Sequence, residues 1–508
     1  MSGIVVAALL LAFVTYIGVG VWLGRRTRGL ADLLPLGLGR AARVASAQEF
    51  SASTVATTIS LATVVIAFFE LAEQLGLWLF WTVLTTSAGL LLVRLLAGRI
   101  WNRMAVYDHR PTLHEFLGTE FHSDALRYVS AACTSLGFLA AFAVELTVGS
   151  RFFAWLVPDV PAPVVVAALS VVAFVYTAVG GFRAVIVTDR IQMVSIRLLL
   201  VALPAFYIYF ALRHVGWAQS LDRIPYDVLH LTYRPGLIAF LVGILIINVP
   251  TFISDMSIWQ RIAGAQRPET VTGGLLSSVL GSAVTWGAFA LLACFSFIFV
   301  VEPAAASVAT LNPLAAVLQV IGTWGTFFSG AVLFVVVLGL YGAMLSTAST
   351  QLIAVSHSVY EDVFSGRLRS SLADRMESQR ELRISRTILV VAALVSTLLV
   401  QVLSMVGFSI ADLVFAIYGS QVGLCPLAIS ALLLKRRQLS RMSDWAASAV
   451  SAGFVIGWGS AAFGVLSKQA SLVFLAPAFS LVVSGILLAA GFLVSGAWKA
   501  PEDDVDPA

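Results

Sequence analysis

Long apolar runs, separated by short segments that hold most of the charges, follow one another along almost the whole chain. A helix needs ~20 apolar residues to cross the ~30 Å hydrocarbon core of a bilayer, and about thirteen runs approach or exceed that length. The pattern therefore predicts an all-α integral membrane protein with about thirteen transmembrane helices. We place them at Ile4 to Leu23, Ser46 to Phe69, Leu75 to Leu96, Leu126 to Val157, Pro161 to Ala178, Val185 to Leu212, Leu237 to Ser254, Thr272 to Val300, Trp324 to Ser356, Ile384 to Met405, Ile410 to Leu434, Ala446 to Leu466 and Ser471 to Val494.

The composition agrees with a membrane protein. Hydrophobic residues make up 59% of the chain, charged residues only 11%, and the mean hydropathy is +0.94. These values lie well outside the usual range of soluble globular proteins. The first run could be read as the core of a signal peptide, but a signal peptide carries its positive charge before the apolar core. Here Arg25, Arg26 and Arg28 come after it, so we expect a mature helix.

Basic residues set the expected orientation, because loops rich in lysine and arginine remain cytoplasmic. Counting the helices alternately from an external N-terminus puts most basic residues on one side, so we predict a bacterial-type inner membrane protein with a cytoplasmic C-terminus and a short acidic tail over 497–508. The net charge of +4 is then a topology signal and implies no nucleic-acid partner. The basic segments are Arg25 to Arg43, Arg94 to Arg127, Arg261 to Arg267, Arg367 to Arg386 and Lys435 to Arg441.

The chain shows no sign of catalysis. Known nucleophile, phosphate-binding, metalloprotease and kinase motifs are absent from the sequence, so we expect no enzyme and no cofactor. The cysteines Cys133, Cys294 and Cys425 are isolated in predicted helices and are expected to be packing residues. The histidines closest in sequence, His109, His114 and His122, lack acidic or cysteine partners at zinc spacing and are expected in a solvated loop.

The apolar run richest in polar residues is Gly342 to Ser358. On a helix, Ala343, Ser346 and Thr347 share one face at i, i+3 and i+4, and Ser346, Ser349 and Thr350 repeat the pattern about one turn further on. Stacked hydroxyl and carbonyl oxygens suit a small hard cation such as sodium. The alternative is that these hydroxyls bond back to their own helix or allow close helix packing.

Two carboxylates lie deep inside predicted spans, where they are costly and mark functional sites or ion pairs. Asp189 stands in the sequence VTDRIQ and Glu145 in AVELTVGS. Asp189 could instead be a residue at the membrane edge that pairs with Arg183 or Arg190. Glu145 could be neutral and hydrogen-bonded.

Interrupted helices are a second feature of membrane transport sites, since unwound backbone offers its carbonyls and amides to ions and solutes. The run from Leu237 contains Asn248, Val249, Pro250 and Thr251, and proline removes a backbone donor there. The run from Ser46 contains Ala56 to Thr63 without glycine or proline, so a break there is only weakly signalled.

At these residues the chain resembles the sodium:solute symporter family. The resemblance rests on VATTIS from Val55, YTAVGGFRAVIVTDRIQ from Tyr176, ISDMSIWQRIAGA from Ile253 and AMLSTASTQLIAVSHSVYEDVF from Ala343. It implies the LeuT fold, with a 5+5 inverted repeat. The implied parts are an extra N-terminal helix at 1–24, repeats of five helices at 44–212 and 236–434, and two C-terminal helices at 444–496.

The resemblance also implies which residues bind the coupling ions. The sodium site general to the family corresponds here to carbonyls and hydroxyls of Ala56, Ile59, Ala343, Ser346 and Thr347. A second sodium, found in some members, corresponds to Asp189, Ser346, Ser349 and Thr350. Each elementary charge that crosses the membrane field contributes ~2.3 kcal/mol per 100 mV, so a second ion roughly doubles the driving force.

The solute is expected beside the two breaks. No buried arginine is expected to receive a carboxylate, and Glu145, with Glu70 and Glu73 near the outer helix ends, favours a cationic solute or a neutral polyol. The alternative is that Glu70 and Glu73 are solvated loop residues. The candidate contacts are Thr58, Ser60, Thr63, Glu145, Asn248, Thr251, Tyr418 and Gln421.

The expected function is therefore sodium-coupled symport of a small organic solute across the lipid bilayer by alternating access. Two alternatives stay open. A proton-coupled carrier would use Asp189 or Glu145, and a solute sensor would need a separate signalling partner.

Overall fold

The computed structural model describes residues 1–27, 29–36, 44–300, 312–365, 378–406 and 410–499. Within these ranges the backbone forms helices and turns without a strand, apart from an isolated bridge between Val44 and Ala265. The predicted acidic tail lies almost wholly outside the described residues, as do parts of two predicted basic segments. The all-α prediction is confirmed for the described part of the chain.

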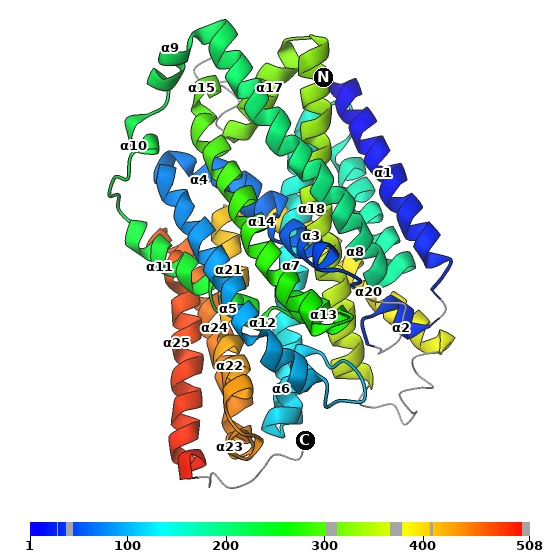
Figure 1. Ribbon diagram of the computed structural model, residues 1–508. Helices are drawn as coiled ribbons and strands as arrows, with labels where there is room; N and C mark the ends of the chain where they lie inside the picture. Colours follow the sequence, from blue (N-terminus) through cyan, green and yellow to red (C-terminus); the bar gives the residue numbers. More distant parts are fainter. Residues whose placement is uncertain (28, 37–43, 301–311, 366–377, 407–409, 500–508) are drawn as a thin grey trace.

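The main helices follow the predicted apolar runs closely (Figure 1). They are α1 (Ser2–Gly24), α3 (Ala47–Thr58), α4 (Ala67–Leu75), α5 (Phe80–Met104), α6 (Leu113–Phe121), α7 (Asp124–Leu156), α8 (Ala162–Phe210), α11 (Leu237–Asn248), α12 (Thr251–Ser254), α13 (Met256–Gly264), α14 (Pro268–Phe295), α15 (Phe297–Val300), α17 (Pro313–Thr323), α18 (Phe327–Ser358), α20 (Gln379–Val406), α21 (Ile410–Gln421), α22 (Cys425–Leu433), α24 (Ser443–Leu466) and α25 (Ala470–Val494).

In the described ranges, eleven helical stretches are long and apolar enough to cross a bilayer, close to the predicted number. Two of them are long enough for two crossings, at 44 and 53 residues. Fifty-three residues of straight helix would measure ~80 Å, more than twice the bilayer core. Each of the two contains a glycine with positive φ, Gly76 (φ 50°) and Gly181 (φ 64°). These glycines divide the long stretches near the predicted helix boundaries.

Gly181 shows why the chain turns where it does. Its φ of 64° and ψ of −161° are strained for any residue with a side chain. A Cβ at this position would also lie 2.7 Å from the backbone of Leu33. Backbone conformation and space thus both require glycine, and the first half of α8 ends here as predicted between Ala178 and Val185.

The other helices pack around two interrupted helices that lie in the middle of the molecule. α18 packs against α8, α7 and α3, and α1 covers α8 and α18 on one flank. α24 and α25 pack together on the opposite flank, as Figure 1 shows. This arrangement places α3, α12, α13 and the polar part of α18 inside the bundle, which determines where a site can form.

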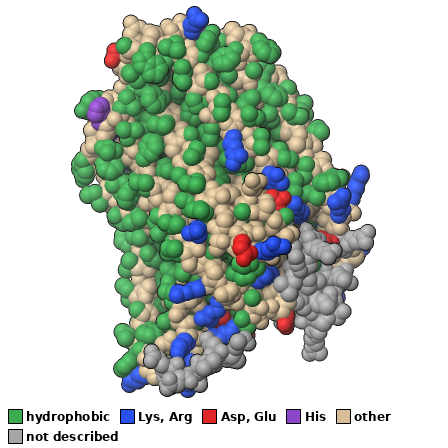
Figure 2. All heavy atoms as spheres, in the orientation of Figure 1, with side chains coloured by type: hydrophobic (Ala, Val, Ile, Leu, Met, Phe, Trp, Pro, Cys, Tyr) green, Lys and Arg blue, Asp and Glu red, His purple; other side chains and the backbone are tan. Residues whose placement is uncertain are grey.

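The outer surface carries the apolar side chains that a soluble protein would bury. Val201, Val284 and Leu466 have exposed fractions of 70%, 72% and 82%. Figure 2 shows such side chains over most of the face in view, with most of the visible lysines and arginines in its lower half. Several carboxylates and hydroxyls are fully buried instead, including Asp189 and Glu145. The polar groups that could form a binding site therefore lie inside the bundle.

Candidate ion and solute site

The first interrupted helix stops where it meets the hydroxyl face of α18. α3 ends at Thr58, and Ile59 (φ −98°, ψ 77°) and Ser60 (φ −74°, ψ 142°) leave the helical conformation before a π-helix over Leu61–Ile66. The last carbonyls of a helix have no partner within it. Here these carbonyls lie against α18. The non-helical residues Ile59 and Ser60 confirm the weakly signalled break.

Four of the five residues predicted for the general sodium site meet at this point. The Ser346 hydroxyl lies 2.8 Å from the Ala56 carbonyl and 3.0 Å from that of Ala343. The Thr347 hydroxyl lies 3.1 Å from the Thr57 carbonyl and 3.4 Å from that of Ala343. Ile59, the fifth predicted residue, is fully buried one position beyond the end of α3. The result is a cluster of neutral oxygens from two helices.

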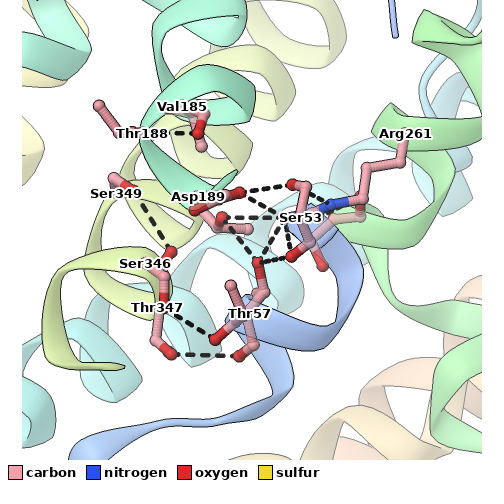
Figure 3. Close-up of polar contacts among 12 residues, drawn as sticks. Ser53, Thr57, Val185, Thr188, Asp189, Arg261, Ser346, Thr347 and Ser349 are labelled. Carbon is pink, nitrogen blue, oxygen red and sulfur yellow. Dashed lines mark hydrogen bonds and ion pairs between the residues drawn. The ribbon is translucent and has the colours of Figure 1, made fainter. Parts of the chain in front are cut away.

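The residues predicted for a second sodium have a different partner. Asp189 is fully buried on α8, and its Oδ2 lies 3.5 Å from Arg261 Nη2 and accepts a hydrogen bond from Ser53. Thr350 Oγ1 lies 3.1 Å from the same guanidinium nitrogen. The Ser349 hydroxyl bonds back to the Ser346 carbonyl of its own helix at 3.3 Å, as the packing alternative expected. Figure 3 shows Asp189 between α18 and Arg261.

Two expectations about charge are wrong. Arg261 was counted with the cytoplasmic loop residues, yet its side chain is 1% exposed and pairs with Asp189. The alternative that Asp189 pairs with Arg183 or Arg190 also fails, because both arginines bind Glu49. The reason is tertiary: α13 folds back after the second break and brings Arg261 against α3 and α8.

Glu49 forms a second ion-pair centre, which sequence reasoning missed. Arg183 reaches both of its oxygens at 2.9 Å, and Arg190 reaches Oε1 at 3.2 Å. The amide of Ala45 donates to it at 2.8 Å. Paired, charge-assisted bonds of this kind are strong and fix orientation. They join the start of α3 to the second half of α8.

The second interrupted helix turns at two places. α11 ends at Asn248 before Pro250, which confirms the predicted break, and a single turn, α12, follows. The non-helical residue comes later, at Asp255 (φ −79°, ψ 111°). Its carboxylate caps α13 by accepting a hydrogen bond of 2.7 Å from the Ser257 amide. Aspartate before a helix is a recognised N-cap, so the segment ISDMS held this signal.

A cavity of about 1190 Å³, including its open part, lies between the two breaks. Six of the eight predicted solute contacts line it, and so do Thr347 and Thr350 of α18. Sequence reasoning missed Asp255, Gln351 and the aromatic residues Phe68 and Trp286. The predicted contacts that line it are Thr58, Ser60, Thr63, Asn248, Thr251 and Tyr418.

The other two predicted contacts, Glu145 and Gln421, are not among the described residues that line this cavity. Glu145 is fully buried on α7, where it accepts hydrogen bonds from the Ser60 hydroxyl and, at 3.4 Å, from the Ala62 amide. It stabilises the break of the first interrupted helix. Gln421 is 5% exposed, and its amide packs closely against Gly137 of α7.

The three histidines that were expected in a solvated loop also differ from expectation. His114 is fully buried, 3.1 Å from Asp362 and 3.0 Å from Thr134. His109 lies 2.8 Å from Glu115, and their donor atoms and that of Glu361 all fall within 4.8 Å of one another. The prediction of histidines without acidic partners is therefore wrong, because the loop folds onto the end of α18.

Comparisons with known proteins agree with this geometry. The solved structures that the chain resembles include a Na+-coupled sialic acid symporter in a substrate-bound outward-open state, with a TM-score of 0.74, 17% identity and coverage of 97% of this chain and 98% of that one. They also include Mhp1, a nucleobase-cation-symport-1 family transporter in a closed conformation, with a TM-score of 0.57, 16% identity and coverage of 91% and 95%. No curated protein sequence matches.

At these identities the structural likeness shows the fold alone, and that fold is the predicted LeuT fold. The model of the sodium:solute symporter family matches residues 34–438, far more than half of the chain. This stretch contains both interrupted helices, α18 and every residue of the oxygen cluster. The chain belongs to the sodium:solute symporter family, and it is a multi-pass membrane protein of the sodium-coupled transporter class.

Proposed function

We propose that this protein carries a small organic solute across the cytoplasmic membrane together with sodium, by alternating access. The observation that carries the proposal is that the Ser346 and Thr347 hydroxyls bond to carbonyls of α3 and that Thr347 also lines the cavity. An ion at these oxygens would join α3 to α18 and, through the unwound segment, shape the cavity. Sodium and solute would then favour the same conformation.

The cavity and the ion pairs suggest which side is open. The cavity lining extends from the breaks toward Leu71, Leu79 and Phe240. At the opposite end, Glu49 and its two arginines join α3 to α8, and Val44 pairs with the end of α13, where its amide donates to the Gly264 carbonyl at 2.8 Å. With basic residues cytoplasmic, this arrangement is open to the outside and closed to the cytoplasm, with the N-terminus outside.

Coupling to sodium is favoured over coupling to protons by the position of the carboxylates. A proton carrier needs a carboxylate that meets the aqueous cavity in turn from each side. Asp189 and Glu145 are fully buried, the first beside Arg261 and the second at the helix break, and neither lines the cavity, whereas Thr347 of the neutral oxygen cluster does.

Reconstituted vesicles test the proposal. We expect an inward sodium gradient to stimulate uptake of one solute from a screened set, and Ser346→Ala and Thr347→Ala each to raise the sodium concentration for half-maximal uptake about tenfold, as expected when an interaction of ~1.4 kcal/mol is lost. Ser278→Ala is the matched control, because this buried serine on α14 bonds only to its own helix at the Gly274 carbonyl, 2.8 Å away, in the described structure.

Sodium-dependent uptake that is unchanged in both α18 variants would reject the assignment. Solute binding without transport by a correctly folded protein would instead favour a sensor.

A further inference from the structure

Three side chains that commonly bind metal ions meet at the end of α18, away from the solute cavity. His109 Nε2 lies 2.8 Å from Glu115 Oε2, and both atoms lie within 4.8 Å of a carboxylate oxygen of Glu361. His109 follows α5, Glu115 stands in the first turn of α6, and Glu361 lies in the π-helix Val359–Phe364 that continues α18. The fold thus brings together donor atoms from two distant parts of the chain.

A separate set of bonds holds Glu361 against α6 and α7. Its neighbour Asp362 accepts a hydrogen bond of 2.7 Å from the Thr112 hydroxyl. Asp362 also lies 3.1 Å from His114 Nδ1 and 3.2 Å from Arg127 Nε. Arg127 Nη2 donates to the Glu361 carbonyl at 2.6 Å. None of these bonds uses the three candidate ligand atoms, so the ligands are held in place before an ion binds.

The donor set suits a divalent transition-metal ion. One neutral imidazole and two carboxylates supply one nitrogen and two oxygens, a mixture that Zn²⁺ and Mn²⁺ accept, whereas Mg²⁺ prefers oxygen ligands. Two positive charges would match the two carboxylates. Glu361 is 1% exposed, but the side chains of His109 and Glu115 are 14% and 13% exposed, which leaves the ion a route from solvent.

A buried donor without an acceptor lies in the same region. His357, four residues before Glu361, is fully buried and interacts electrostatically with His109. Its Nδ1 lies 3.0 Å from the side-chain nitrogen of Gln260, which can only donate, so Nε2 of the neutral ring carries the hydrogen. None of the described residues accepts a hydrogen bond from this Nε2. A water bound to the metal ion would supply the missing acceptor.

We propose that His109, Glu115 and Glu361 bind one divalent transition-metal ion, for which Zn²⁺ and Mn²⁺ are the matching probes. The site is distinct from the solute cavity, whose described lining contains none of the three ligands. It joins the segment around α6 to the end of α18, the helix that also carries Ser346 and Thr347. A bound ion would therefore stabilise this arrangement of the helices.

Metal titration of the purified full-length protein tests the proposal. The protein is prepared without a histidine tag, stripped with a chelator and titrated with Zn²⁺, Mn²⁺ or Mg²⁺ in a calorimeter, without sodium or solute. We expect one site per molecule for Zn²⁺ and Mn²⁺, with Zn²⁺ bound more tightly, and much weaker binding of Mg²⁺. Glu361→Gln, Glu115→Gln and His109→Asn should each lower the affinity for Zn²⁺ about tenfold or more.

His122→Asn is the matched control. His122 is an exposed histidine that follows α6 and does not belong to the cluster. Asparagine tolerates the left-handed backbone at this position (φ 53°), so the variant should fold and bind Zn²⁺ as the wild type does. A loss of affinity equal to that of His109→Asn would mean adventitious binding to imidazoles and would overturn the proposal.

Three further results would also overturn it. They are a wild type that binds none of these ions, Zn²⁺ affinity that is unchanged in His109→Asn, and an affinity for Mg²⁺ equal to that for Zn²⁺, which would indicate carboxylate ligands alone. Should the buried Glu361→Gln variant not fold, His109→Asn decides, because this side chain is partly exposed and makes none of the bonds to Asp362. The titrations use neither sodium nor solute, so their outcome does not depend on the proposed function.

Discussion

The two interrupted helices reach the same outcome by different means. In the second, Pro250 ends α11 and Asp255 caps α13 by bonding to Ser257, two residues away. In the first, the sequence around Ile59 and Ser60 contains neither proline nor glycine. There the buried Ser60 hydroxyl and Ala62 amide donate hydrogen bonds to Glu145, 85 residues away from Ser60 on α7. The Ser60 hydroxyl also accepts a hydrogen bond of 2.8 Å from the Thr63 amide. The first break therefore combines a local cap with a bond to a neighbouring helix, whereas the second is capped within its own sequence.

This difference has consequences for stability. A locally capped break keeps its partner whatever the surrounding helices do. A break held from another helix depends on the packing of α7 against it, so loss of the distant group leaves buried donors without an acceptor. The carbonyls of the proposed sodium site belong to this second kind of break, which links ion binding to the position of α7.

The largest effect is expected for Glu145→Ala. The Ser60 hydroxyl and the Ala62 amide would both lose their acceptor, and an unsatisfied buried donor costs ~1–3 kcal/mol, so we expect a loss of roughly 3 kcal/mol. The apparent melting temperature of the purified protein should fall clearly. Glu145→Gln keeps the shape and one acceptor oxygen and should lose less. An unchanged melting temperature for Glu145→Ala would show that the first break holds itself.

A smaller effect is expected for Asp255→Ala. The substitution removes the cap of α13 at Ser257, and the loss of an N-cap costs ~1 kcal/mol. Asp255→Asn should retain nearly wild-type thermal stability, because asparagine caps a helix as well as aspartate does. If Asn destabilised the protein as much as Ala, the charge in the cavity and not the cap would be what matters.

Pro250→Ala should have the smallest effect, below ~0.5 kcal/mol. Alanine would allow α11 to continue further, but the extended backbone at Asp255 (ψ 111°) and its cap would still interrupt the helix. Thermal stability and the number of bound sodium ions should both stay close to the wild type. A larger loss than for Asp255→Ala would mean that the proline, and not the cap, maintains the second break.

Much of the fold was accessible from residue types alone. Apolar length located the helices within a few residues, and Gly181 lies inside the predicted gap between Ala178 and Val185. The periodicity of α18 placed Ala343, Ser346 and Thr347 on one face, and the structure brings that face to the end of α3. These features depend on local spacing, which is why a pattern could predict them.

The errors share a cause. Arg261 counted as a loop charge, and Glu145 was not linked to the helix break, yet each lies buried against partners far away in the chain. Glu49 escaped notice because its arginines come from α8, 134 and 141 positions further on. No local pattern shows which of several charges will meet inside a bundle.

Hydropathy and helical period were thus enough to establish a many-spanning helical membrane protein with an oxygen-rich face on α18, because both act over one or two turns of the chain. Which charges neutralise one another at Asp189, and what holds the unsignalled break at Ser60, emerged only once the helices were packed. Burying an unpaired charge or donor is costly, but any suitable partner that the fold brings within reach can remove that cost.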